Sequence, residues 1–195
     1  MGRRMEVIDK EYLKNMYDDY VANFSSPDMA ASYELCEYLI NQCIDNDYKK
    51  IIDLGSGISS AFLRYYQSKF NDVIIYSVDD SKEWLEITKE FLVKYNLSTD
   101  NLIHDIETVK ENNFDLVLHD YGRMGTRQKY LSYVISNLTN KKSKIILDDL
   151  HKNKYKTYVT KFAADNEMTL VNIPETHDKF KRYSMEICST QIINH

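Results

Sequence analysis

The sequence predicts an α/β protein built on a doubly wound, mostly parallel seven-stranded sheet, with a C-terminal antiparallel hairpin and an N-terminal helical cap. Short apolar strand patterns alternate with helical patterns five times along the 195 residues, which is typical of a parallel sheet with helices on both faces. The last two strand patterns are joined by a short polar loop, whereas a parallel crossover needs about a dozen residues or more. We therefore expect this final pair to form an antiparallel hairpin at one edge.

Apolar spacing defines the elements in chain order. Residues 8–24 and 28–45 are expected to be helices, because apolar side chains of the second recur every three or four positions and Pro27 suits its start. Strands are expected where β-branched and other apolar residues run together. The further expected elements are strand 50–54, helix 58–69, strand 73–78, helix 82–95, a weak strand 101–106, strand 114–118, helix 126–138, strand 144–147, helix 153–166 and strands 168–173 and 183–188.

Charge and composition argue against several functional classes. The formal net charge is −5, whereas a general nucleic-acid binder usually has a basic domain. No apolar run approaches the ~20 residues that span a bilayer, and no apolar leader segment follows the basic N-terminus. The three cysteines form no CxxC pair, as expected of reduced thiols in a cytoplasmic protein. We expect one domain over 1–195, with a helical cap over 1–47 and a core over 48–195.

The first informative motif follows strand 50–54. The chain has only five glycines, and Gly55 and Gly57 fall where the strand ends and a helix begins at once. Such a turn lets a ligand approach the backbone at the carboxyl edge of a parallel sheet. Asp79 ends the next strand, where a carboxylate can accept both hydroxyls of a ribose. Asp80 is an alternative for this role, because strand register cannot be fixed to one residue from sequence. The bland alternative is a plain strand–helix turn beside an exposed acid.

Two cofactors fit a strand, a glycine turn and a strand-end acid. NAD motifs read Gly-x-Gly-x-x-Gly, but the third glycine position here is Ser60. Asp53, two residues before Gly55, would place a negative charge near the pyrophosphate of NAD. The same charge suits the cationic amino group of S-adenosylmethionine, which has a ribose and no phosphate. An NAD(P)-dependent oxidoreductase is kept as an alternative.

These residues resemble the class I (Rossmann-like) S-adenosylmethionine-dependent methyltransferases over about residues 28–190. The terminal antiparallel hairpin is also typical of that family. The resemblance implies that the glycine loop holds the methionine part of the cofactor, a strand-end acid holds the ribose, and an acid after the third strand meets the adenine. The implied cofactor-binding residues are Asp53, Gly55, Ser56, Gly57, Asp79 or Asp80, Asp105 and Asp120.

A second group of acids lies at the ends of two later strands. Asp120 follows strand 114–118, and Asp148 and Asp149 follow strand 144–147. Three carboxylates that close would raise one another's pKa values unless a positive charge lies among them. A hard divalent cation such as Mg²⁺ is a common solution.

This acid pattern resembles the metal-dependent, catechol-type O-methyltransferases and related sugar O-methyltransferases. The resemblance implies a divalent metal on Asp120, Asp148 and Asp149, and methylation of a hydroxyl that the metal helps to ionise. The departure from the pattern is His151, two residues after the acid pair. Asp120 and His151 are the candidate catalytic residues, and histidine as a residue type titrates near neutrality. A metal-free Asp/His base and a purely structural role for the acids remain alternatives.

Several other side chains have two interpretations each. Trp84 is either a wall for the adenine or part of the core. Tyr20, on the first helix, either covers a ligand or packs inside. His119 should point to the other face of the sheet from Asp120, which favours a packed histidine. The expected activity is S-adenosylmethionine-dependent O-methylation of a small molecule or sugar, by a cytoplasmic protein that forms a homodimer. A non-catalytic S-adenosylmethionine-binding module is the further alternative.

Overall fold

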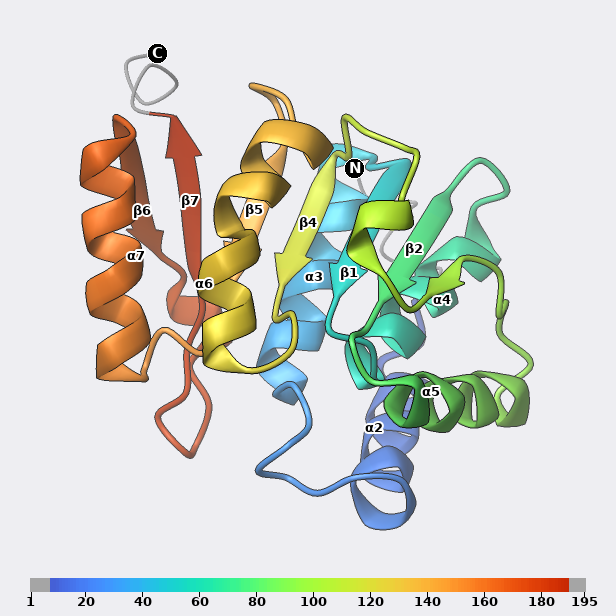
Figure 1. Cartoon of the computed structure of the whole chain (residues 1–195). Helices are drawn as coiled ribbons and strands as arrows, with labels where there is room; N and C mark the ends of the chain where they lie inside the picture. The colour runs from blue at the N-terminus through green and yellow to red at the C-terminus, as the bar shows by residue number, and fades with distance from the viewer. Residues whose placement is uncertain (1–7, 190–195) are drawn as a thin grey trace.

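The computed structural model describes residues 8–189 and contains a seven-stranded sheet with strand order β3-β2-β1-β4-β5-β7-β6 (Figure 1). β1, β2, β3, β4 and β5 pair in parallel, and β7 is antiparallel to both β5 and β6. The predicted α/β class, mostly parallel sheet and C-terminal antiparallel hairpin are therefore confirmed. Residues 1–7 and 190–195 of the expected domain lie outside the described residues. The strands are β1 (Lys50–Leu54), β2 (Ile74–Val78), β3 (Leu102–Ile103), β4 (Leu116–His119), β5 (Lys144–Leu147), β6 (Met168–Asn172) and β7 (Met185–Ser189).

Helices cover both faces of this sheet (Figure 1). One apolar core joins α2, α3, α4 and α5 to one face, and a second core joins α6 and α7 to the other. The helices are α2 (Lys10–Asn23), α3 (Tyr33–Asn46), α4 (Ile58–Lys69), α5 (Lys82–Lys94), α6 (Met124–Tyr133) and α7 (Asn153–Asp165).

The two cores follow from the alternation of side chains along each strand. In β1, Ile51 belongs to the core under α3 and α4, while Ile52 belongs to the core under α6 and α7. In β4, Leu116 and Leu118 face the first core and Val117 faces the second. Because successive residues of a strand point to opposite faces, a continuous apolar run is buried on both sides, as in other parallel sheets.

Register brings the carboxyl ends of four strands to one level. Leu54 at the end of β1 pairs with Val78 of β2 and with His119 of β4, and His119 pairs with Leu147 of β5. We call these four strand ends, with the loops that follow them, the rim. It lies at the lower edge in Figure 1, where α2 also lies.

Local structure corrects three expected boundaries. The second helix begins at Tyr33 rather than at residue 28, because Ser32 caps it by accepting the Leu35 N–H at 3.1 Å. The weak strand 101–106 shortens to β3 and is followed by a 3₁₀ turn, η1 (Ile106–Thr108). The helix expected over 126–138 begins at Met124 and passes at Val134 into one π-helical turn, η2 (Val134–Leu138).

The segment between β6 and β7 contacts the segment between α2 and α3. Arg182, in the segment between β6 and β7, donates from Nη1 to the carbonyl oxygen of Ala30 at 2.9 Å. Its Nε donates to Asp178 at 2.6 Å. The segment between α2 and α3 is thereby attached to the C-terminal hairpin. Within residues 8–189, the helices are all too short or too polar to cross a membrane, and Cys36 and Cys43 are buried free thiols.

Candidate functional site

A cavity of about 320 Å³ opens at the rim, between the ends of β1, β2 and β4 and the segment that joins α2 to α3. This volume lies at the lower end of the range for small-molecule sites, about 300–1,000 Å³. The lining comes from segments far apart in sequence, as expected at the carboxyl edge of an open α/β sheet. The lining residues are Tyr20, Met29, Ala30, Ala31, Gly55, Ser56, Gly57, Ile58, Ser59, Asp79, Asp80, Ser81, Trp84, Asp120, Gly122, Arg123 and Arg127.

The glycine loop is shaped by close approach to the end of β4. Gly55 has φ +104°, and a Cβ at this position would lie 2.5 Å from the carbonyl oxygen of Asp120. The Asp120 N–H donates to the Leu54 carbonyl at 2.7 Å, which fixes the two strand ends together. Gly122 has φ +58°, and a Cβ there would collide with the carboxylate of Asp80. Gly55 therefore requires glycine, because it meets backbone that cannot give way, whereas the contact at Gly122 is with the end of an exposed side chain that can move.

Asp79 and Asp80 both line the cavity, but they differ in environment. The Asp79 carboxylate accepts the N–H groups of Ser56 and Ser81, each at 2.9 Å. Burial raises the pKa of Asp79, and these hydrogen bonds oppose that rise. Asp80 is exposed beside Gly122. Asp79 thus holds the glycine loop against the end of β2. Its Oδ2 also accepts the Ser56 hydroxyl at 3.3 Å, whereas Oδ1 retains capacity for a further donor.

Two aromatic side chains border the glycine loop. Trp84 of α5 donates from Nε1 to the Ser56 carbonyl at 2.6 Å, so it supports the loop as well as lining the cavity. Tyr20 of α2 is 1% exposed, and its hydroxyl has no hydrogen-bond partner among the described residues. A Cβ on Gly57 would lie 3.0 Å from that hydroxyl. Tyr20 therefore presents an unused donor beside the glycine loop.

Asp53 and Asp105 do not line the cavity. Asp53 is fully buried and accepts the hydroxyl groups of Ser59 at 3.0 Å and Ser60 at 2.6 Å. Burial raises the pKa of Asp53 to about 7, against the lowering effect of these hydrogen bonds. Asp105 is exposed, and its carboxylate accepts the Glu107 N–H at the start of η1. Their predicted contacts with the cofactor remain predictions.

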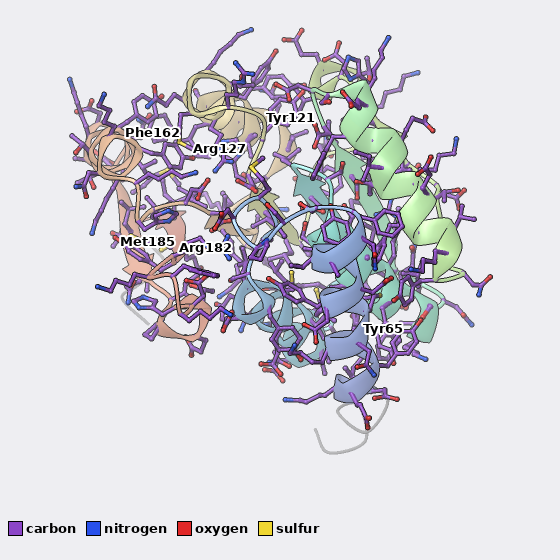
Figure 2. The ribbon with its side chains drawn as sticks, turned by 90° about the horizontal axis from the view of Figure 1, so that it is seen from below. Tyr65, Tyr121, Arg127, Phe162, Arg182 and Met185 are labelled. Atoms are coloured by element: carbon purple, nitrogen blue, oxygen red, sulfur yellow. The ribbon has the colours of Figure 1, made fainter. Side chains whose placement is uncertain are left out.

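The three strand-end acids do come together, and Arg127 of α6 lies among them. We call Asp120, Asp148 and Asp149 the acid cluster. Arg127 Nη2 contacts Asp120 Oδ1, and its Nη1 lies 2.7 Å from Asp149 Oδ2. Figure 2, which views the molecule from below, labels Arg127 and Arg182. Arg127 is 7% exposed, and a buried guanidinium of this kind needs such partners to offset its loss of water.

Burial and the neighbouring charges together set the direction of each pKa in the acid cluster. Burial raises the pKa of Asp120 well above its ordinary value, and Arg127 opposes that rise. Burial also raises the pKa of Asp148, and Asp149 adds to the effect. Burial would raise the pKa of Asp149 too, but Arg127 and Lys152 hold it below its ordinary value. Asp120 is the acid of the cluster that lines the cavity.

His151 and His119, for which the sequence predicted a catalytic and a packing role, both lie outside the cavity. The Nδ1 atom of His151 is 3.7 Å from Asp149 Oδ1, and His151 is absent from the cavity lining. His119 is fully buried and donates from Nε2 to the Arg127 carbonyl at 3.1 Å. Burial lowers the pKa of His119 to about 4, as expected for a packed, neutral histidine. Its predicted structural role is therefore supported.

A divalent metal does not fit the acid cluster in this arrangement. Arg127 contacts the carboxylates of Asp120 and Asp149, and Lys152 Nζ lies 2.6 Å from Asp149. Asp148 accepts the Ser184 hydroxyl at 2.8 Å. Within residues 8–189, no group of three His, Cys, Asp or Glu side chains is arranged to hold a metal ion. Mg²⁺ would need several of these oxygens at about 2.1 Å, where the arginine now lies.

Sequence reasoning missed Arg127 and most of the segment between α2 and α3. The sequence indicated that a positive charge should lie among the acids, and Arg127 is seven residues after Asp120, in the first turn of the next helix. This nearness in sequence made Arg127 one candidate for that charge, but only the structure selects it from the other basic residues. Met29, Ala30 and Ala31 line the cavity because they precede the helix instead of forming its first turn.

Comparison with known proteins supports this fold. No protein-family model and no curated protein sequence matches the chain. Solved structures do match it along nearly its whole length. The chain has the methyltransferase fold. Three similar structures are an S-adenosylhomocysteine-bound methyltransferase of Podospora anserina (16% identity, 93% of this chain and 88% of that chain, TM-score 0.71), an O-methyltransferase of Bacillus cereus in complex with S-adenosylhomocysteine (15%, 92% and 90%, 0.70), and a Streptomyces achromogenes O-methyltransferase involved in tomaymycin synthesis, in complex with S-adenosylmethionine (13%, 92% and 89%, 0.67).

Proposed function

We propose that this protein is an S-adenosylmethionine-dependent methyltransferase that methylates a hydroxyl group. The observation that carries the proposal is the rim cavity, in which the glycine loop, the acids after β2 and Asp120 after β4 line one space. This arrangement occurs on the methyltransferase fold, and structural neighbours were solved with S-adenosylhomocysteine or S-adenosylmethionine bound.

The chain offers a separate group for each part of the cofactor. The backbone around Gly55 and Gly57 can approach the methionine moiety closely, and the Tyr20 hydroxyl can donate to its carboxylate. Asp79 and Asp80 offer carboxylates for the ribose hydroxyls, and the Trp84 ring offers an apolar wall. A ligand that supplies an acceptor to Tyr20 would also satisfy a buried hydroxyl that has no partner among the described residues.

Methyl transfer needs little covalent help from the protein. The acceptor oxygen forms a bond to the methyl carbon as the bond from that carbon to sulfur breaks, and the acceptor proton must leave. Asp120 is the acid of the cluster placed on the cavity wall, and its raised pKa makes it a stronger base than an ordinary carboxylate. We assign it the proton, and we assign the remaining lining to holding the reactants in line.

The acceptor is proposed to be a small molecule or sugar. The cavity is of small-molecule size, and the net charge of −5 is unfavourable for binding nucleic acid. Arg123 is an exposed cation at its edge. A homodimer and a cytoplasmic location stay predictions.

Calorimetric titration of the whole chain tests cofactor identity. We expect saturable binding of S-adenosylhomocysteine and S-adenosylmethionine, and none of NAD⁺. Binding of NAD⁺ alone would favour an oxidoreductase. Absence of binding by both adenosyl compounds, in protein shown to be folded, would overturn the proposal.

Matched variants assign the ribose acid. Asp79→Asn and Asp80→Asn are compared with Asp72→Asn, which lies in the loop before the opposite end of β2 and pairs with Lys49. We expect weaker S-adenosylhomocysteine binding by Asp79→Asn or Asp80→Asn, by about ten-fold for loss of a charged hydrogen bond, and unchanged binding by Asp72→Asn.

Turnover is tested by the release of S-adenosylhomocysteine from S-adenosylmethionine in the presence of a panel of hydroxyl compounds. A non-catalytic module would bind the cofactor and release no S-adenosylhomocysteine above background.

A further inference from the structure

We infer that the Arg127 guanidinium takes the place of a divalent cation in this site, so that the acid cluster is held by a protein side chain and Asp120 works without a metal. This inference rests on the proposed methyltransferase function. It concerns how the site is assembled, and it can fail while cofactor binding stands.

Arg127 occupies the position that a bridging metal would need. Arg127 bridges the ends of two adjacent strands, through Asp120 after β4 and Asp149 after β5. A metal bound by these acids would have to bridge the same two strand ends. The planar guanidinium has donors fixed in a fork, which suits two carboxylates at once.

Hydrogen bonds hold Arg127 in this position. It lies in the first turn of α6, and its Nε donates to the Gly122 carbonyl at 3.3 Å. Its own carbonyl accepts a hydrogen bond from buried His119. Its anchors therefore belong to the end of β4 and the loop that also carries Asp120. Displacement of the side chain by a metal would leave a buried cation without partners, which is costly.

Other donors already use further carboxylate oxygens of the acid cluster. Asp149 Oδ2 is shared by Arg127 and Lys152, and Asp148 Oδ1 accepts the Ser184 hydroxyl. Buried Arg127, the more exposed Lys152 and one hydroxyl donor thus meet three acids. The positive charge that such a cluster requires is already present in the sequence.

In this arrangement the positive charge near the acceptor comes from Arg127 and not from a metal. Arg127 lines the same cavity as Asp120, so its positive charge faces the space proposed for the acceptor. There it can orient the Asp120 carboxylate, which takes up the acceptor proton. Arg127 is in this sense a positioning residue, and the acceptor oxygen needs no bond to a metal.

The experiment is a Mg²⁺ and Mn²⁺ titration, read by calorimetry and by the thermal unfolding midpoint, of wild type, Arg127→Gln, Arg127→Lys and Arg123→Gln. We expect wild type to show no saturable metal binding and to bind S-adenosylhomocysteine equally with and without EDTA. Arg127→Gln should gain a metal-dependent rise in unfolding temperature, because the freed acids then need a cation. Arg123→Gln, the nearby exposed arginine, should gain none.

The possible results distinguish failure of this inference from failure of the proposed function. Saturable Mg²⁺ or Mn²⁺ binding by wild type, abolished by Asp149→Asn, would overturn the inference. A metal response in Arg123→Gln equal to that in Arg127→Gln would also overturn it. Where Arg127→Gln fails to fold, Arg127→Lys keeps one charge at the site and should resemble wild type in lacking a metal response. Absence of S-adenosylhomocysteine binding by the wild-type protein would instead count against the proposed function.

Discussion

A Cβ on Gly55 would lie 2.5 Å from the carbonyl oxygen of Asp120, so the loop after β1 and the end of β4 are in direct backbone contact. The glycine that shapes the proposed cofactor site also sets the position of the proposed base. A shift of the backbone at Gly55 should therefore displace the backbone of Asp120 as well.

Gly55→Ala should destabilise the protein, and Gly125→Ala should not. The first change adds a methyl group where backbone must move and where φ is +104°, at a cost of roughly 1–3 kcal/mol. The second lies in α6 with nothing within 4 Å of the added Cβ, and should stabilise by about 0.5–1 kcal/mol. Urea unfolding of both variants checks the opposite signs, and a similar loss in both would contradict the prediction.

Tyr20→Phe should weaken S-adenosylhomocysteine binding without lowering stability. The hydroxyl that it removes is buried and has no partner among the described residues, so its loss should leave the unfolding temperature equal or higher. A lost hydrogen bond to ligand corresponds to about 2–10-fold in affinity. Calorimetry measures the affinity, and Tyr12→Phe, on the same helix and outside the cavity, is the control. Unchanged affinity would leave Tyr20 with a packing role alone.

Asp120→Asn should abolish most turnover while cofactor binding persists. Loss of a general base costs about 10²–10⁴-fold in rate, whereas His151→Gln should retain the wild-type rate because His151 does not line the cavity. Both are measured as initial rates of S-adenosylhomocysteine release, with circular dichroism to confirm folding, since Arg127 loses a charged partner in the first variant. The reverse ranking would assign the base to His151.

Asp53 should make stability fall as pH rises. Its pKa is raised to about 7 in the folded protein by burial, from an ordinary value of 3.8, so the folded state holds the proton more tightly than the unfolded chain. Stability is therefore lost between about pH 4 and pH 7. Since a ten-fold change in equilibrium is about 1.4 kcal/mol, the full loss is at most about 4 kcal/mol.

Asp53→Asn removes this pH dependence. The free energy of unfolding of the variant, relative to wild type, should increase between pH 4 and pH 8. Asp72→Asn is the control, because Lys49 lowers the pKa of exposed Asp72 and any change with pH should have the opposite sign. Parallel pH profiles for Asp53→Asn and wild type would contradict the raised pKa.

The predicted fold was largely correct because its signals are local. Strand β1 and helix α4 match their predicted bounds, since a continuous apolar run, a glycine turn and a helical period follow one another without ambiguity. The predicted start of α3, at residue 28, was wrong, because the helix begins at Tyr33. Pro27 and Ser32 both resemble helix starts, and only the hydrogen bond from Leu35 to Ser32 decides between them.

The site was predictable in location but only partly in content. Parallel pairing of β4 with β5 brings Asp120 and Asp149 together, and the sequence already placed both residues at the ends of predicted strands. The cation that lies between these acids is Arg127 because its side chain points toward them from α6. Helical spacing alone does not predict that direction. Asp53 looked like a ligand because of its place in the motif, yet its carboxylate is covered by Ser59 and Ser60, whose rotamers no sequence pattern specifies.

The hydrogen bond from Arg182 to the Ala30 carbonyl joins positions separated by 152 residues. Ala30 lines the cavity, whereas Arg182 lies between the antiparallel strands β6 and β7. A chain cut before Arg182 could still form β1 and the glycine loop, yet it would lack this attachment beside the cavity. Deletion of the C-terminal hairpin should therefore weaken ligand binding through the segment that joins α2 to α3, even though the hairpin contributes no described residue to the cavity lining.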